Sequence, residues 1–184
     1  MKAAVLREVG KPLTVEDVQI NKPGPREVLI RTVAAGVCHS DLHFVEGSYP
    51  YPLPAVLGHE SAGVVEQVGS EVHTVKPGDH VITCLSAFCG HCEHCLTGHM
   101  SLCVSPETKR QQGEEPRLGA SAGAMNQFLN LSSFAEQMLI HEHACVAVRK
   151  DMPLDRAALI GCAVGLSNAY LDMRDRVSDI EINP

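Results

Sequence analysis

The feature that most constrains this chain is a cluster of four cysteines with the spacing C-x2-C-x2-C-x7-C, formed by Cys89, Cys92, Cys95 and Cys103. Each C-x2-C step lets two thiolates in one tight loop face the same point, and Gly90 favours that turn because glycine tolerates positive φ. Four deprotonated thiolates are a ligand set that zinc takes at closed, structural sites. We therefore predict a structural zinc ion that organises a loop lobe over residues 86–105.

Other interpretations of this cluster stay open at the level of sequence. Four cysteines at close spacing also hold iron–sulfur clusters, although the last gap differs from the common ferredoxin runs. Four free thiols in a row would be exposed to oxidation. His91, His94 and His99 lie nearby and are expected to face solvent rather than to replace a cysteine ligand.

Composition supports metal binding over disulfides. The chain has 184 residues, of which 45% are hydrophobic, so it is long enough to bury a core without covalent staples. The N-terminus has no apolar stretch of the kind that a secretory signal contains, so we expect a cytoplasmic location. In a reducing compartment, eight cysteines and ten histidines point to metal ligation.

Charge and hydropathy exclude several classes of partner. The formal net charge is −7 and no basic block occurs, which argues against nucleic-acid and anionic-membrane binding. The longest run of apolar residues and glycine covers 157–166, which is shorter than the roughly 18 residues that a spanning helix needs.

Short β-branched segments separated by turn residues predict a mainly β fold, a barrel or a sandwich. The expected strands cover 28–33, 63–69, 80–83, 132–140 and 144–148. One helix is expected to begin near Pro153 and a second, short helix to cover 167–177. Residues 86–132 are expected to be loops. We expect surface or strand positions for His73, His80, His141 and His143, buried thiols at Cys84 and Cys145, and packing or loop positions for Met125 and Met138.

A second group of metal-binding residue types is dispersed along the chain. Residues 38–43 read Cys-His-Ser-Asp-Leu-His, residues 58–60 read Gly-His-Glu, and Cys162 follows much later. Two cysteines and one histidine form one of the ligand sets of open, catalytic zinc sites, which leave a position for water or substrate. From chemistry alone the prediction is weak, because a single cysteine is often a small buried apolar residue.

The order of the motifs adds a resemblance. Residues 36–43, 58–65 and 76–81, the four-cysteine lobe and residues 160–164 follow one another as in the GroES-like catalytic domain of zinc-dependent alcohol dehydrogenases of the medium-chain dehydrogenase/reductase superfamily. The chain resembles this family from residue 1 to about residue 165. The resemblance implies a mainly β, partly open GroES-like barrel with short helices and a zinc-bound loop lobe.

The same resemblance implies roles for individual residues. Cys38, His59 and Cys162 would hold a catalytic zinc, and the four clustered cysteines a structural zinc. Ser40 and His43 would pass the alcohol proton towards solvent, partly through hydroxyls of the cofactor ribose. Asp41 would orient the ligand histidine and Glu60 would lie beside the metal. His39 would meet the cofactor pyrophosphate, and Leu85 would line the substrate pocket. The implied substrate is a small alcohol or aldehyde, with NAD or NADP as cofactor.

The chain departs from the family in one respect. A Rossmann domain needs a G-x-G-x-x-G fingerprint, and no such pattern occurs in these 184 residues. We expect one domain, 1–184, in which 166–184 is a return segment with a helix at 168–175 and a strand at 176–183, and no cofactor domain. Such a chain is expected to be inactive or weak alone. The alternatives are a non-catalytic zinc scaffold, a hydrolase that uses zinc-bound hydroxide, and a partner that supplies the cofactor domain; the oligomeric state stays open.

Overall fold

The structure is a computed structural model, and it describes residues 1–111, 113–120 and 123–162. Within these residues the chain is mainly β, as predicted, with short α and 3-10 helices. The expected return segment 166–184, with its helix and its strand, lies outside the described residues.

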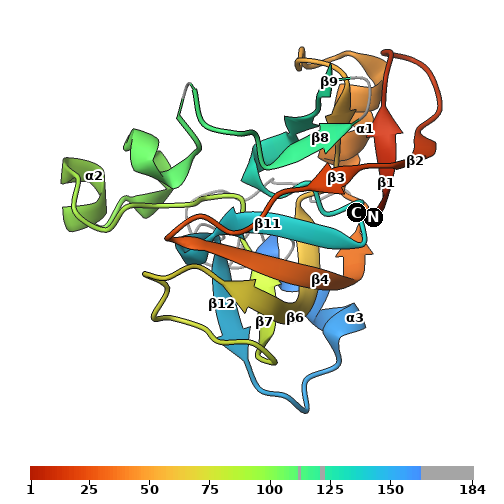
Figure 1. The fold of residues 1–184 in the computed structure, drawn as a ribbon. Helices are drawn as coiled ribbons and strands as arrows, with labels where there is room; N and C mark the ends of the chain where they lie inside the picture. Colours follow the sequence, from red (N-terminus) through yellow and green to blue (C-terminus); the bar gives the residue numbers. More distant parts are fainter. Residues whose placement is uncertain (112, 121–122, 163–184) are drawn as a thin grey trace, which may run out of the picture.

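The largest sheet is antiparallel and has five strands in the order β11-β4-β6-β7-β12 (Figure 1). Its strands are β4 (Glu27–Gly36), β6 (Glu60–Val68), β7 (His80–Thr83), β11 (Gln137–His141) and β12 (Cys145–Val148). These strands correspond to the β-branched segments that the sequence predicts. Bulges in the pairing of β4 with β6 shift the register along the long central pair.

Two smaller sheets complete the β structure, and none of the three sheets closes into a barrel among the described residues. One has the order β10-β5-β1-β2 and the other β3-β8-β9. Their strands are β1 (Lys2–Leu6), β2 (Thr14–Asp17), β3 (Gln19–Ile20), β5 (Ala55–Val56), β8 (Leu118–Ala120), β9 (Gly123–Ala124) and β10 (Asn126–Gln127). The expectation that 86–132 consists of loops is therefore wrong for β8, β9 and β10. These strands have two or three residues, too few for an alternating pattern to be visible.

Both faces of the five-stranded sheet are covered. Val28 and Ile30 of β4 and Val81 of β7 belong to the main buried cluster on one face. On the other face, α3 (Leu154–Ala157) and the 3-10 helix η5 (Ala158–Gly161) pack on Ala62 and its neighbours. This second contact brings the end of the described chain back to β6 and β7. Two further 3-10 helices are η3 (Phe128–Asn130) and η4 (Glu142–Ala144).

Helix α1 (His39–Glu46) follows β4 directly and was not predicted from the sequence. The carboxylate of Asp41 accepts a hydrogen bond from the backbone N–H of Cys38, the residue before the helix. The helix ends at Gly47, whose φ of 79° is the left-handed conformation that glycine adopts at helix ends. Phe44 and Val45 pack against the buried cluster around Phe128.

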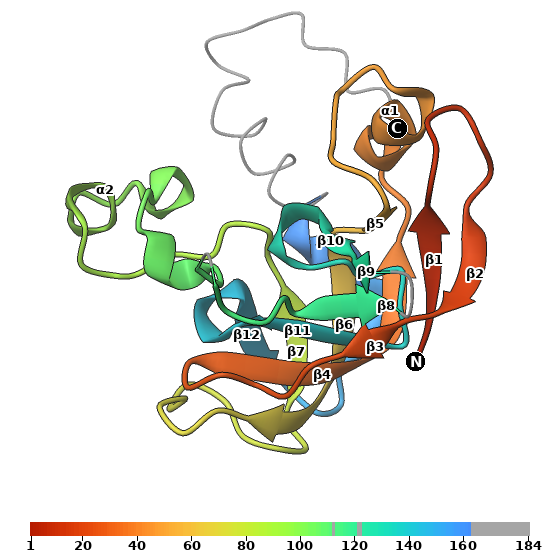
Figure 2. The ribbon, with the colours of Figure 1, turned by 45° about the horizontal axis from the view of Figure 1, so that its top comes forward.

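The segment with the four cysteines projects from the sheets as a separate lobe in both views (Figure 2). It contains α2 (Glu93–Leu96) and the 3-10 helices η1 (Met100–Leu102) and η2 (Pro106–Thr108). Among the described residues, no helix is long and apolar enough to cross a lipid bilayer.

Candidate metal centres

The dispersed cysteine and histidine residues meet at one place. The ligand atoms of Cys38, His59, Glu60 and Cys162 all lie within 4.8 Å of one another. Cys38 immediately precedes α1, His59 and Glu60 stand at the start of β6, and Cys162 follows η5. Helix η5 packs beside β6, so the fold brings Cys162 to the start of that strand although they are far apart in sequence. We call this group the open cluster.

Asp41 lies behind the open cluster and joins its parts. Only 2% of its surface is exposed, and its carboxylate has three hydrogen-bond partners. Oδ2 accepts from the backbone N–H of Cys38 at 3.1 Å. Oδ1 accepts from the N–H of Gly58 at 3.3 Å and lies 3.2 Å from Nδ1 of His59. A carboxylate at Nδ1 fixes the proton there, so Nε2 keeps a free lone pair for a metal.

The hydroxyl of Ser40 contacts two residues of this group. Its Oγ lies 3.1 Å from Sγ of Cys38 and 3.4 Å from Nε2 of His59. Both contacts converge on the face of the cluster that carries the ligand atoms. A hydroxyl at this position can exchange a proton with a group bound between Cys38 and His59.

The charges of the open cluster favour a bound cation. Burial raises the pKa of the Cys162 thiol to about 12, and the nearby Cys38 and Glu60 add to this effect. Burial acts in the same sense on Cys38, but hydrogen bonds from Ser40 and His59 outweigh it and lower the pKa of that thiol. For His59, burial is outweighed by Asp41 and Cys38, which raise its pKa. Two thiols and a carboxylate crowded in this way repel one another when ionised, and a divalent cation removes that repulsion.

The other residues predicted at this site lie around it. His39 is exposed, and its ring meets that of His43 edge to face at 4.8 Å. The ring of His43 also contacts Tyr49, with centroids 5.4 Å apart. Leu85 is half-buried and packs on the main core cluster. The structure therefore places His39 at the start of α1 with His43 one turn later, and shows Leu85 in contact with the core.

Two further residues shape the open cluster and were missed as contributors. Phe128, fully buried, places its ring edge to face with that of His59, with centroids 6.1 Å apart. Gly161 passes so close to the carbonyl of Thr83 that a Cβ would collide with it, which lets Cys162 approach β7. The glycine before Cys162 is a usable sequence signal for close approach, whereas nothing in the sequence links Phe128 to His59.

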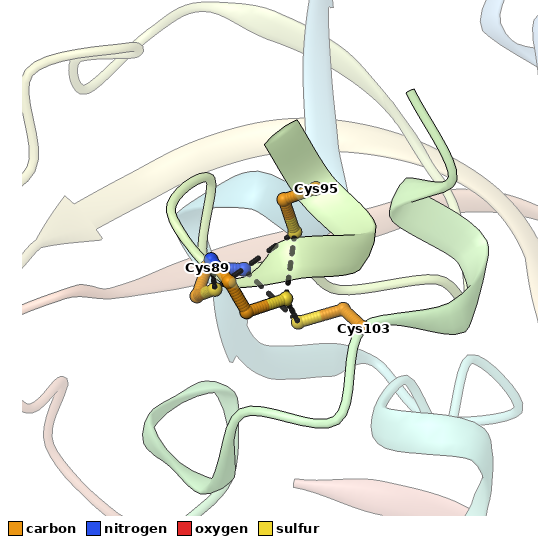
Figure 3. A group of neighbouring side chains, drawn as sticks. Cys89, Cys95 and Cys103 are labelled. Atoms are coloured by element: carbon orange, nitrogen blue, oxygen red, sulfur yellow. Dashed lines mark hydrogen bonds between the residues drawn. The ribbon is translucent and has the colours of Figure 1, made fainter. Parts of the chain in front are cut away.

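The four clustered cysteines also converge, and we call them the closed cluster. All four Sγ atoms lie within 4.8 Å of one another, and Figure 3 shows the sulfur of Cys95, on α2, pointing to those of the flanking loops. Three separations are 3.8 Å for Cys89–Cys95, 3.5 Å for Cys92–Cys95 and 3.9 Å for Cys92–Cys103. A tetrahedron with Zn–S bonds of about 2.3 Å has edges of about 3.8 Å, so these distances suit one tetrahedral ion.

Backbone N–H groups point at the sulfurs of the closed cluster. His91 and Cys92 donate to Sγ of Cys89 at 3.5 and 3.3 Å, and Cys89 donates to Sγ of Cys103 at 3.3 Å. Burial opposes ionisation of Cys89, but these donors lower the pKa of its thiol to about 6. Burial and the neighbouring sulfurs instead raise the pKa of Cys95 to about 11. Opposite pKa shifts of this kind are expected where four thiols lie close together, because all four can ionise only if a cation neutralises their negative charges.

The geometry separates the alternatives for the closed cluster. All eight cysteines are free, and the S–S separations are far above the roughly 2.05 Å of a disulfide. A polynuclear iron–sulfur cluster spreads its cysteine ligands around several metal atoms, whereas sulfurs this close fit a single ion.

The cysteine and methionine residues outside the two clusters were expected to pack or to lie in loops. Cys145 is buried as expected, while Cys84 is only half-buried. Met125 and Met138 are buried in the core, within the range predicted.

Comparisons with known proteins identify the family of the chain. Residues 24–150 match the alcohol dehydrogenase GroES-like domain family. An NDMA-dependent alcohol dehydrogenase of Amycolatopsis methanolica is 42% identical over 169 residues, which cover 89% of this chain and 45% of that protein. The chain thus spans less than half the length of this relative.

Solved structures resemble the fold as well. An alcohol dehydrogenase zinc-binding domain protein from Burkholderia ambifaria superposes with a TM-score of 0.83 and 39% identity, over 92% of this chain and 47% of the other. Benzyl alcohol dehydrogenase from Acinetobacter calcoaceticus gives a TM-score of 0.78 and 34% identity, over 89% and 45%. The mainly β, GroES-like fold class with short helices is therefore confirmed.

Proposed function

The chain belongs to the alcohol dehydrogenase GroES-like domain family, and on that premise we propose that it is the zinc-carrying catalytic domain of an NAD(P)-dependent enzyme that interconverts alcohols and aldehydes. The observation that carries this proposal is the open cluster, in which Cys38, His59 and Cys162 present three soft ligands and Asp41 orients the histidine. Three protein ligands leave a fourth position for a substrate oxygen.

In this proposal each cluster has its own task. A zinc ion at the open cluster would act as a Lewis acid on the substrate oxygen and make its proton easier to lose. Glu60 would lie beside the metal as an additional carboxylate. The closed cluster would hold a second zinc ion whose four protein ligands leave no room for substrate. This second zinc would therefore stabilise the fold of the lobe.

The residues around the open cluster would move the proton and receive the cofactor. Ser40 Oγ would take the proton of the alcohol; its contacts with Cys38 and His59, the two residues that frame the open position, support this role. His43 follows on the same helix, half-buried, and can pass a proton to solvent. His39 is exposed and free to meet the pyrophosphate of a dinucleotide, and Leu85 would contribute to the substrate pocket.

We further propose that residues 1–184 act as one catalytic domain whose activity alone is weak. The dinucleotide fingerprint does not occur in this chain, so the cofactor has few groups to hold it. Hydride transfer gains much of its rate from holding two reactants together, and that gain is lost without a cofactor site. A cytoplasmic location agrees with the proposal, because thiolate ligands need a reducing environment.

Metal content of matched cysteine variants tests the two-site assignment. We expect two zinc ions per chain in the wild-type protein, measured by inductively coupled plasma mass spectrometry. Cys38→Ser is expected to keep one zinc, because it removes a ligand of the open cluster only. Cys84→Ser is the control, since Cys84 lies in neither cluster, and it should keep two. A Cys38→Ser protein that still holds two zinc ions contradicts the assignment.

Turnover tests the reaction itself. With added NAD or NADP, the chain should oxidise small alcohols slowly, and Cys38→Ser should abolish this turnover while Cys84→Ser leaves it unchanged. Alcohol oxidation that survives loss of Cys38 rules out the open cluster as its centre. Zinc-dependent ester hydrolysis without alcohol oxidation would instead support the hydrolase alternative.

A further inference from the structure

A buried pair of hydroxyl groups joins two strands beside the open cluster. Ser61, on β6, has no exposed surface and follows Glu60 directly, and Thr83, the last residue of β7, is 1% exposed. Their side-chain oxygens, Oγ of Ser61 and Oγ1 of Thr83, lie 2.6 Å apart. The Thr83 hydroxyl donates to the backbone carbonyl of Ser61 at 3.3 Å, and Oγ of Ser61 lies 3.3 Å from the sulfur of Met138. The shortest of these contacts links β6 directly to β7.

The hydroxyl pair stands where the backbone pairing of β6 with β7 ends. The last opposed residues of this pairing are Ala62 and Ile82. The next residue outward on each strand is Ser61 on β6 and Thr83 on β7. Hydrogen bonds between opposed serine and threonine side chains stabilise neighbouring strands. This pair therefore fixes the separation of the two strands at the end that lies next to the open cluster.

Each strand of the linked pair adjoins a different part of the open cluster. His59 and Glu60 directly precede the serine on the chain, so a displacement of β6 would displace both of them. On β7, the backbone carbonyl of Thr83 lies so close to Gly161 that a Cβ there would collide with it. Cys162 is the next residue, and its backbone therefore rests on β7. The hydroxyl pair thus connects the strand that carries His59 to the strand that supports Cys162.

The fold itself has little need of these hydroxyl groups. Met138, which Ser61 contacts, belongs to the main apolar cluster of the core. When both members of a buried hydrogen-bonded pair are replaced by apolar groups of the same shape, the change in stability can be close to zero. The contribution of the pair is therefore expected in the strand separation that it sets.

We propose that Ser61 and Thr83 are positioning residues of the open cluster, because their hydrogen bond keeps β6 and β7 at the separation at which His59 and Cys162 can bind one metal ion. This proposal rests on the proposed function, since it requires that the open cluster holds zinc. The ligands of such a site must stay within about 0.5 Å of their best positions, so a small change of strand separation weakens binding.

The test is cadmium-113 NMR of the protein loaded with cadmium in place of zinc, because each occupied site gives its own resonance. The wild type should give two resonances, and the one that is lost in Cys38→Ser belongs to the open cluster. Thr83→Val removes the hydroxyl and keeps the shape of the side chain, so it should move this resonance and leave the other in place. Thr83→Ser keeps the hydroxyl and should restore the wild-type position.

The outcomes separate this proposal from the one on which it rests. A single resonance in the wild type overturns the two-site function, and the positioning role with it. Two resonances in the wild type, with both unchanged in Thr83→Val, overturn the positioning role alone. If Thr83→Val does not fold, Ser61→Ala decides by the same measurement, because it removes the other hydroxyl of the pair.

Zinc affinity, measured by competition with a chromophoric chelator, gives the size of the effect. Thr83→Val should release the open-cluster zinc at about two- to tenfold lower chelator concentration, the fold-change that corresponds to one neutral hydrogen bond. Ser61→Ala should have an equal effect, and the double variant should be no weaker than either single variant, because both remove the same bond. Effects that add in the double variant overturn a shared role.

A matched threonine serves as the control. Thr108 is also buried, and its hydroxyl donates to the backbone carbonyl of Ser105, but it belongs to neither cluster. Thr108→Val should therefore leave the open-cluster resonance and the affinity of that site unchanged. An equal response of Thr108→Val and Thr83→Val would show a general effect of losing a buried hydroxyl and overturns the proposal.

Discussion

Replacing Asp41 by asparagine is expected to weaken one metal site and to lower stability at the same time. The carboxylate accepts from Cys38, Gly58 and His59 through both of its oxygens. An asparagine side chain of the same shape has one oxygen and one NH2 group. In either orientation the NH2 group faces at least one N–H donor, so at least one buried donor loses its acceptor.

The magnitude follows from these contacts. A buried donor without its acceptor costs about 2 kcal/mol, and in a domain of this size that lowers Tm by about 4–8 °C. His59 also loses the carboxylate that fixes its proton on Nδ1, and loss of such a partner lowers zinc affinity about 10- to 100-fold. The closed cluster has no contact with Asp41 among its hydrogen bonds and should keep its affinity.

The assay is competition for zinc with a chromophoric chelator, combined with thermal unfolding. The wild type should release two zinc ions at similar chelator concentrations, and Asp41→Asn should release one of them at about 10- to 100-fold lower chelator concentration. Asp155→Asn is the control, because Asp155 is exposed on α3 and lies in neither cluster. A chelator profile of Asp41→Asn equal to that of Asp155→Asn refutes the role given to Asp41.

Three further changes have expected outcomes. Cys103→Ser should remove the closed-cluster zinc and abolish hydrogen-exchange protection in residues 86–105, while protection of the five-stranded sheet persists; retained protection in the lobe would contradict this. Burial opposes ionisation of Glu27, but Arg110 and Arg117 outweigh it and lower its pKa from 4.5 to about 2. Its contribution to stability is therefore complete above about pH 4.5 and is lost as the pH falls to about 2. Glu27→Gln should flatten the pH dependence of the free energy of urea unfolding between these two pH values. A pH dependence equal to that of the wild type would contradict this. Gly58→Ala should destabilise the protein more than Gly78→Ala in urea unfolding. Both glycines have φ near 90°, but only a Cβ at position 58 would meet Ser133 and Phe134, at 2.5 and 2.6 Å. Equal losses of unfolding free energy in the two variants would show that backbone strain alone matters.

The spacing of the four clustered cysteines predicts the closed cluster, because the gaps between these residues are short. The open cluster follows only from the resemblance to a known family, since Cys162 lies far from Cys38 and His59 in the sequence. The strands around Ile30, Val64 and Val81 were also predictable, since their β-branched residues are bounded by turn residues. Helix α1 is not predicted by the sequence pattern of its eight residues, although Gly47 at its end is a recognisable stop signal.

Other features depend on contacts that no local pattern encodes. His141 was expected at the surface or on a strand; it is on a strand but fully buried. Its strand partner Glu27 is bonded to Arg110 and Arg117, which lie 83 and 90 residues later in the chain than Glu27. Strands β8 and β10 are paired with β3 and β5 from the N-terminal third, so their formation depends on long-range pairing rather than on sequence alternation.

The projecting lobe lacks the apolar packing that stabilises the rest of the fold. Phe88 is half-buried and stacks on His143, but other large apolar side chains of the lobe face outward, with Leu96 73% exposed and Val104 74% exposed. Over 86–105 the buried apolar side chains are those of Ala87 and Cys89. We therefore expect the order of the lobe to depend on the zinc ion proposed for the closed cluster. Under such linkage the stability of the lobe rises with the logarithm of free zinc, by about 1.4 kcal/mol for each tenfold increase above the dissociation constant. The lobe is thus expected to respond to zinc availability in its surroundings, while the sheets behind it do not.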